Sequence, residues 1–155
     1  DKIPFSMLAH EYMEDYQEKS YACDLHSDVL DVVNKAKNLG FSQTVLSASK
    51  MDYLLKQMKT LHVDDLFDSI YGINDIYAKS KVELAHAFKQ TCSLDDEIYF
   101  VGDSVHDYEV AKNIGAKCIL VTTGHQNRAT LESVNVPVMD SLMESLDLIY
   151  ERDKD

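Results

Sequence analysis

The sequence is poor in several residue types, and each shortage argues against a class of protein. It has no tryptophan, 3 cysteines, 2 prolines and 5 glycines among 155 residues. So little proline and glycine argues against long disordered linkers. Because the cysteines are scattered and form no C-x-x-C pair, they suit reduced core thiols better than a disulfide framework or a zinc site. We therefore expect a reducing compartment and a cytoplasmic location.

Positive charge is scarce as well. The chain carries 15 basic against 27 acidic residues, a formal net charge of -12. A field of this sign repels a nucleic-acid backbone, so we expect no nucleic-acid partner. No apolar run reaches the roughly 18 residues that a membrane span needs, and we expect no membrane partner. The acidic excess is interpreted as a solvated surface, and the oligomeric state stays open.

Short apolar runs alternate with segments of helical periodicity along the chain. Such alternation predicts an α/β fold, with a parallel sheet covered by helices on both faces. Right-handed crossovers bring the carboxyl ends of all the strands to one edge. The predicted strands are 43–47, 67–72, 97–101, 117–122 and 136–139, and the predicted helices are 5–19, 29–36 (ended by Gly40), 50–61, 81–91, 108–114 and 141–150.

The most informative segment is Tyr99-Phe100-Val101-Gly102-Asp103-Ser104-Val105-His106-Asp107. It places two carboxylates, Asp103 and Asp107, where a buried strand gives way to a helix. Mg²⁺ takes carboxylate oxygens, and a helix N-terminus favours anions, so this segment predicts metal-assisted phosphate chemistry. The alternative is structural: Asp103 caps the helix, and Asp107 lies on its exposed first turn.

Two further positions suit phosphate binding. Ser47 ends a predicted strand, and the small residues Ala48 and Ser49 that follow leave backbone N–H groups available to an anion. Lys81 opens a predicted helix behind the candidate cap Ser80, where a cation opposes the helix dipole unless a charge partner meets it. The alternatives are an ordinary helix cap for Ser47 and a solvated surface lysine for Lys81.

Two histidines are weaker candidates. His106 lies between the two acids, and His125 belongs to residues 124–127, which follow a predicted strand and are expected to line the rim of the sheet. Either imidazole could ligate a metal or transfer a proton. The alternative for both is a surface or loop histidine.

Ser47, a helix-opening lysine and Gly102-Asp103-x-x-x-Asp107 occur in the order that resembles the second, third and fourth motifs of the haloacid-dehalogenase-like hydrolases, in the phosphoglycolate-phosphatase-like branch. The resemblance spans residues 28–124. It implies a Rossmann-like core, Mg²⁺, and hydrolysis of small phosphorylated metabolites through an aspartyl-phosphate. Ser47 and Ala48 would bind the phosphate, Lys81 would neutralise it, and Asp103 and Asp107 would serve the metal. Lys79 is the alternative lysine, because Glu83 then has the spacing of some family members.

The chain departs from the family pattern at its N-terminal end. The first family motif, D-x-D on the first strand, supplies the nucleophile and is not found here. We therefore expect residues 1–24 to be the remnant of a helical cap domain. Residues 25–155 would be the core without its first strand, inactive alone but part of a longer phosphatase.

Three other functions stay open. The same motifs suit a phosphomutase, which uses the same aspartyl-phosphate. A non-catalytic α/β module could keep the phosphate pocket without the nucleophile. A flavodoxin-like domain without any phosphate role is the third, and the ordered set of Ser47, Lys81 and Asp103 argues against it.

Overall fold

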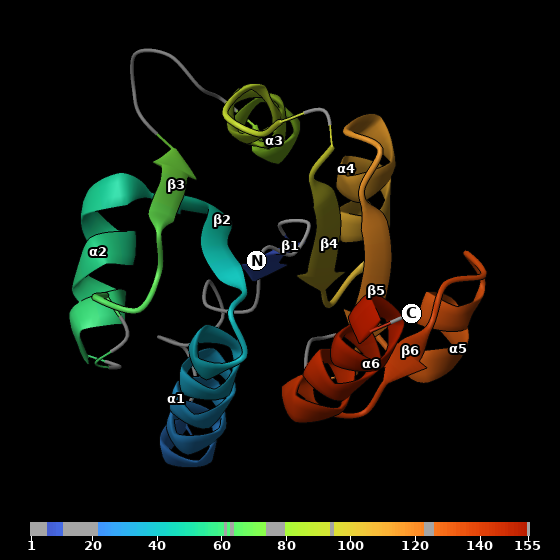
Figure 1. Ribbon diagram of the computed structural model, residues 1–155, viewed down its shortest axis with the longest axis horizontal. Coiled ribbons are helices and arrows are strands. Elements are labelled where there is room, and N and C mark those ends of the chain that lie inside the picture. The colour runs from blue at the N-terminus through green and yellow to red at the C-terminus, as the bar shows by residue number, and fades with distance from the viewer. Residues whose placement is uncertain are drawn as a thin grey trace.

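The computed structural model describes residues 6–10, 22–60, 62, 64–73, 80–93, 95–122 and 126–154. Helices and strands alternate through these residues, as the hydropathy pattern predicts (Figure 1). The elements are β1 (Ser6–His10), α1 (Ala22–Asn38), β2 (Ser42–Lys50), α2 (Met51–Thr60), β3 (Ser69–Ile73), α3 (Lys81–Gln90), β4 (Glu97–Gly102), α4 (Val105–Asn113), β5 (Lys117–Val121), α5 (Arg128–Glu132), β6 (Val138–Met139) and α6 (Leu142–Lys154).

The strands form one parallel sheet in the order β3-β2-β1-β4-β5-β6. Chain order runs outward from the centre in both directions, which is the pattern of a doubly wound α/β fold. In such a sheet the crevice beyond the strand carboxyl ends, where the strand order reverses, is the usual binding site. The α/β fold class predicted from the sequence is therefore confirmed.

Two separate apolar clusters cover the two faces of the sheet. Alternate residues of β4 divide between them: Tyr99 and Val101 face one cluster, while Ile98 and Phe100 face the other. The first cluster takes in buried side chains of α1, α2 and α6, and the second those of α3, α4 and α5. Figure 1 accordingly shows α1 and α6 on one side of the sheet and α3 and α4 on the other. Period-two burial of this kind is what a strand covered on both faces requires.

The N-terminal segment differs from the prediction. Ser6–His10 is a strand between β2 and β4, so the helix predicted for 5–19 is wrong there. The predicted absence of a first strand is corrected too, because β1 occupies that central position. A vacant centre would leave the backbone N–H and C=O groups of β2 and β4 unpaired, and pairing with β1 satisfies them. Residues 6–10 belong to the core sheet and Ala22 begins α1, so the cap remnant predicted over 1–24 is wrong at these positions. Residues 11–21 lie outside the described residues, and for them it stays a prediction.

Candidate active site

A buried ion pair joins two helices beside the carboxyl edge of the sheet. Lys81 Nζ donates to Asp107 Oδ1 at 3.0 Å, and the two side chains are 7% and 0% exposed. Lys81 is the first residue of α3, and Asp107 lies in the first turn of α4. The two residues are 26 positions apart in the chain, so the fold brings together the lysine and one of the acids that the sequence singled out.

The second oxygen of Asp107 organises the turn that carries Asp103. Asp107 Oδ2 accepts from the backbone N–H of Asp103 at 2.9 Å and from that of Ser104 at 3.1 Å. The Ser104 hydroxyl donates to the same oxygen at 3.2 Å. Ser104 also caps α4 and accepts from the Asp107 N–H, so the two residues form a reciprocal capping box. Through one carboxylate, Asp107 fixes both Lys81 and the backbone of Asp103.

Gly102 makes room for this carboxylate. A Cβ atom at position 102 would lie 2.3 Å from Asp107 Cβ and 2.5 Å from its Oδ2. Those distances are far inside van der Waals contact, and Asp107 is held on both of its oxygens. Glycine is therefore needed here for the close approach of a side chain to the strand end.

The two acids differ in detail from the structural alternative that the sequence left open. Ser104 caps α4, not Asp103, and Asp107 is fully buried rather than lying on an exposed first turn. The helix also begins at Val105, three residues before the predicted start. The reason for the early start is the Ser104 capping box, since the N-cap defines the first turn.

The lysine of the pair occupies an unfavourable end of its helix. Ser80 caps α3 by accepting from the Glu83 N–H at 3.2 Å, which places Lys81 at the positive end of the helix dipole. Asp107 supplies the compensating charge, and α3 packs against α4. Two helix N-termini thus meet at this pair, an arrangement that favours an anion. Lys79, the alternative lysine, lies outside the described residues.

Ser47 lies on β2, fully buried, with Ala48 next to it in the strand. β2 continues to Lys50, beyond the predicted end at Ser47, and its pairing with β3 shifts register between Leu46 and Lys50. His10 of β1 pairs with both Val45 and Val101. Ser47 and Asp103, each two residues further on, therefore reach the same level of the sheet. Two strands with one other strand between them lie about 10 Å apart.

The remaining candidates divide. His106 is an exposed residue of α4, as the surface alternative has it, and His125 lies outside the described residues. Burial, reinforced by the charge of Asp107, raises the pKa of the Cys118 thiol on β5 to about 12, so this thiol stays protonated. The sequence predicts no more for Gln126 than a place on the rim of the sheet. Its side chain in fact accepts from the Val105 N–H, a contact for which no sequence pattern gives a signal.

The donor set limits what the site could hold. Among the described residues, no three or more His, Cys, Asp and Glu side chains are placed to share a metal ion. Mg²⁺ typically takes one or two protein carboxylates and completes its shell with water and phosphate oxygens, so a site with few carboxylates still suits it. Asp103 is half-buried and Asp107 is engaged with Lys81. The residues therefore fit a hard cation held mainly by Asp103, with Asp107 behind it.

The sequence matches a known protein family over most of its length. Residues 2–121 match the family described as haloacid dehalogenase-like hydrolase, which covers most of the chain. The chain belongs to this family. A comparison with curated protein sequences finds no significant match. In the described part of the chain, no helix is long and apolar enough to cross a membrane.

Solved structures of this family share the fold at low identity. A haloacid dehalogenase-like hydrolase from Streptococcus pneumoniae superposes with a TM-score of 0.71 at 19% identity, over 79% of this chain and 58% of its own. A predicted phosphoglycolate phosphatase from Haemophilus somnus gives 0.67 at 18%, over 79% and 56%. A putative β-phosphoglucomutase from Thermotoga maritima gives 0.67 at 14%, over 80% and 57%. The chain thus spans less than two thirds of each of these three relatives.

Proposed function

We propose that the chain is the phosphate-binding and metal-binding part of a Mg²⁺-dependent phosphatase that acts on small phosphorylated metabolites. Family membership supports hydrolase chemistry. The observation that carries the proposal is the buried Lys81–Asp107 pair at 3.0 Å. Burying two charges costs free energy that an apolar pair of similar volume would not cost. This cost is explained if the lysine of the pair, which lies beside the strand ends, also binds a substrate anion.

The proposed roles follow from position. Lys81 would neutralise the phosphate, and Ser47 with the Ala48 backbone N–H would hydrogen-bond it from across the sheet. Phosphoryl transfer depends mostly on positioning and charge neutralisation, which these groups would supply. Substrate phosphate would then lie between β2 and β4, where the strand order reverses.

Asp103 is proposed as the Mg²⁺ ligand. When bound, the ion would polarise a phosphate oxygen and offset its charge. Asp107 is proposed as the residue that orients the site, because its two oxygens hold Lys81 Nζ and the Asp103 N–H. A ligating carboxylate needs such support to keep its geometry.

We propose that the chain lacks the family nucleophile on its first strand. The family reaction needs an aspartate on the first strand, and β1 reads Ser-Met-Leu-Ala-His. The chain by itself would bind phosphate and Mg²⁺ without turnover. Phosphatase activity of the pure chain, abolished by Asp103→Asn, would contradict this part of the proposal. A cytoplasmic location is part of the same proposal and rests on the unpaired thiols of Cys92 and Cys118.

A phosphomutase is the second candidate, favoured by the structural likeness to the Thermotoga maritima protein. Both activities would use the same phosphate and metal groups. They differ in product: a phosphatase releases inorganic phosphate, whereas a mutase returns a phosphorylated isomer. Product analysis on a longer protein that contains this segment separates them, and binding without turnover in that longer protein would favour a non-catalytic module instead.

The test is calorimetric titration of the chain with inorganic phosphate, with and without Mg²⁺. We expect Mg²⁺ to strengthen phosphate binding and Lys81→Met to weaken it by roughly tenfold, since an opposite charge in a partly dry site is lost. Lys117→Met is the matched control, because this exposed lysine pairs with Glu97 at 2.7 Å, away from Asp107. Equal phosphate affinity in the Lys81 and Lys117 variants would overturn the proposal.

A further inference from the structure

A side chain from the connection that follows β5 contacts the turn that carries Asp103. Gln126 Oε1 accepts from the backbone N–H of Val105 at 2.8 Å, between two residues 21 positions apart in the chain. Gln126 lies just before α5, and Val105 is the first residue of α4. The contact therefore joins the connection that follows β5 to the first turn of α4.

The backbone N–H of Val105 donates to a residue outside the turn. The Asp103 and Ser104 N–H groups bond to Asp107, and the Asp107 N–H bonds to Ser104, so these three are satisfied within the turn. The first N–H groups of a helix have no partner inside it and need one from outside. For Val105 that partner is the side chain of Gln126, which lies 21 positions away in the chain.

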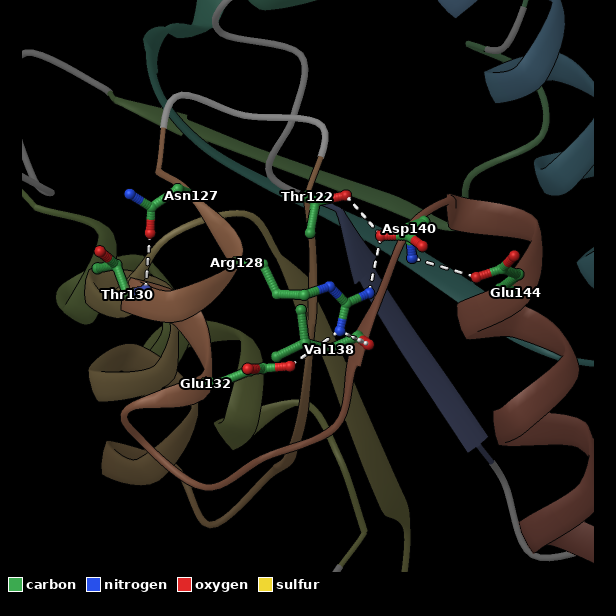
Figure 2. Close-up of polar contacts among 8 residues, drawn as sticks. All are labelled: Thr122, Asn127, Arg128, Thr130, Glu132, Val138, Asp140 and Glu144. Carbon is green, nitrogen blue, oxygen red and sulfur yellow. Dashed lines mark hydrogen bonds and ion pairs between the residues drawn. The ribbon is translucent and has the colours of Figure 1, made fainter.

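Hydrogen bonds hold the residues that follow Gln126 in place (Figure 2). Asn127 caps α5 by accepting from the Thr130 N–H at 2.9 Å. Arg128 donates to Asp140 at 2.7 Å and to the Val138 carbonyl at 3.2 Å, which fastens the start of α5 to the end of β6. The residues directly after Gln126 are thus held against a neighbouring strand, which restricts where its side chain can reach.

We propose that Gln126 is a positioning residue for the metal and phosphate site. It would hold the Asp103–Val105 backbone from outside while Asp107 holds it from inside, and so set where the Asp103 carboxylate points. This inference rests on the function proposed above. Without the Gln126 acceptor, the turn would keep its capping box but lose its tie to the β5 side, and a bound cation would lose a fixed ligand.

The experiment uses two variants of equal side-chain length in the full chain. Gln126→Met removes the acceptor, and Gln126→Glu keeps an acceptor oxygen. Binding of Mg²⁺ alone is followed by the amide NMR shifts of Asp103 and Ser104, and hydrogen exchange of the Val105 amide is measured without metal. We expect Gln126→Met to speed Val105 exchange and weaken Mg²⁺ binding roughly tenfold, the low end for loss of a group that orients a ligand. Gln126→Glu should bind Mg²⁺ at least as tightly as the parent.

Asn127→Ala is the control for general damage. It removes the cap of α5 in the same connection and leaves the Gln126 side chain in place, so it should lower the thermal midpoint and leave Mg²⁺ affinity unchanged. The inference is overturned if Gln126→Met binds like the parent, if Gln126→Glu binds as weakly as Gln126→Met, or if Asn127→Ala weakens binding equally. A parent chain that binds no Mg²⁺ refutes instead the metal site in the proposed function, and this inference with it.

Discussion

Two ion-pair clusters of the molecule have almost the same interatomic distances and opposite surroundings. Lys81 and Asp107 meet at 3.0 Å with 7% and 0% of their side chains exposed. Arg128 meets Glu132 at 3.0 Å and Asp140 at 2.7 Å, with exposures of 42%, 54% and 68% for the three side chains. Distance does not distinguish the clusters, so their energetic and functional meaning has to come from burial.

Burial changes what each cluster contributes. Charges at the surface are hydrated and screened by salt, so the Arg128 cluster serves mainly to orient α5 against β6. The Lys81–Asp107 pair is almost completely removed from water, so each charge is stabilised by the other instead of by hydration. Such a pair contributes little net stability, but it fixes the position of the lysine side chain. The proposed phosphate site therefore belongs with the buried cluster, whereas the exposed cluster fastens α5 to β6.

Breaking the buried pair gives the largest expected effect. Asp107→Ala leaves the Lys81 ammonium buried without its carboxylate and opens the capping box, so we expect a loss of about 3–5 kcal/mol in the free energy of unfolding. Lys81→Met should cost less, because Asp107 keeps its hydrogen bonds to Ser104 and the Asp103 N–H. Urea denaturation followed by circular dichroism measures both.

The control for that pair is an exposed one. Lys35 and Asp147 meet at 3.1 Å with exposures of 47% and 58%, and Lys35→Met should change the free energy of unfolding by less than about 1 kcal/mol. The double variant of Lys81 and Asp107 should be less destabilised than the sum of the two singles, because no lone charge remains. An Asp107→Ala chain as stable as Lys35→Met would remove the distinction between the clusters.

Crowding the buried pair should have an intermediate effect. Gly102→Ala places a methyl group 2.3 Å from Asp107 Cβ, and we expect a loss of about 1–3 kcal/mol with displacement of the turn. Gly115→Ala is the matched control: its φ is +72° and a Cβ there meets nothing within 4 Å, so it costs only backbone strain of about 1–2 kcal/mol. The decisive readout is the Asp103 and Ser104 amide shifts, which Gly102→Ala alone should move.

Much of the fold and of the buried site could be predicted from the sequence, because these features follow local rules. Alternating apolar runs predicted five of the six strands, and the G-D-x-x-x-D spacing predicted both acids at a strand end. Lys81 was found as the first residue of a capped helix, since Ser80 is a typical N-cap. Which carboxylate the lysine meets depends on how α3 packs on α4, and no periodicity encodes that.

Three misses have physical reasons. Residues 6–10 have apolar spacing compatible with a helix, and a five-residue strand is too short for period-two alternation to outweigh it. Only the paired neighbours β2 and β4 select the extended form. Gln126 was missed because a glutamine side chain that caps a distant helix depends on the meeting of two connections, which tertiary structure sets. Short helix α5 was missed for lack of a full apolar stripe.

Titrating the exposed cluster should give the smallest effect and the sharpest contrast. The hydrogen bonds from Arg128 and then Thr122, with the Arg128 charge, hold the pKa of Asp140 below its usual 3.8. A depressed carboxyl pKa stabilises the fold above pH 3.8, and that contribution is lost as pH falls through the lower folded value. We expect Arg128→Ala to return the pKa of Asp140 towards 3.8, and about 0.5 M salt to do so in part, because the pair is exposed. Carboxyl NMR titration measures it, and a pKa unmoved by either change would mean that this cluster behaves like the buried one.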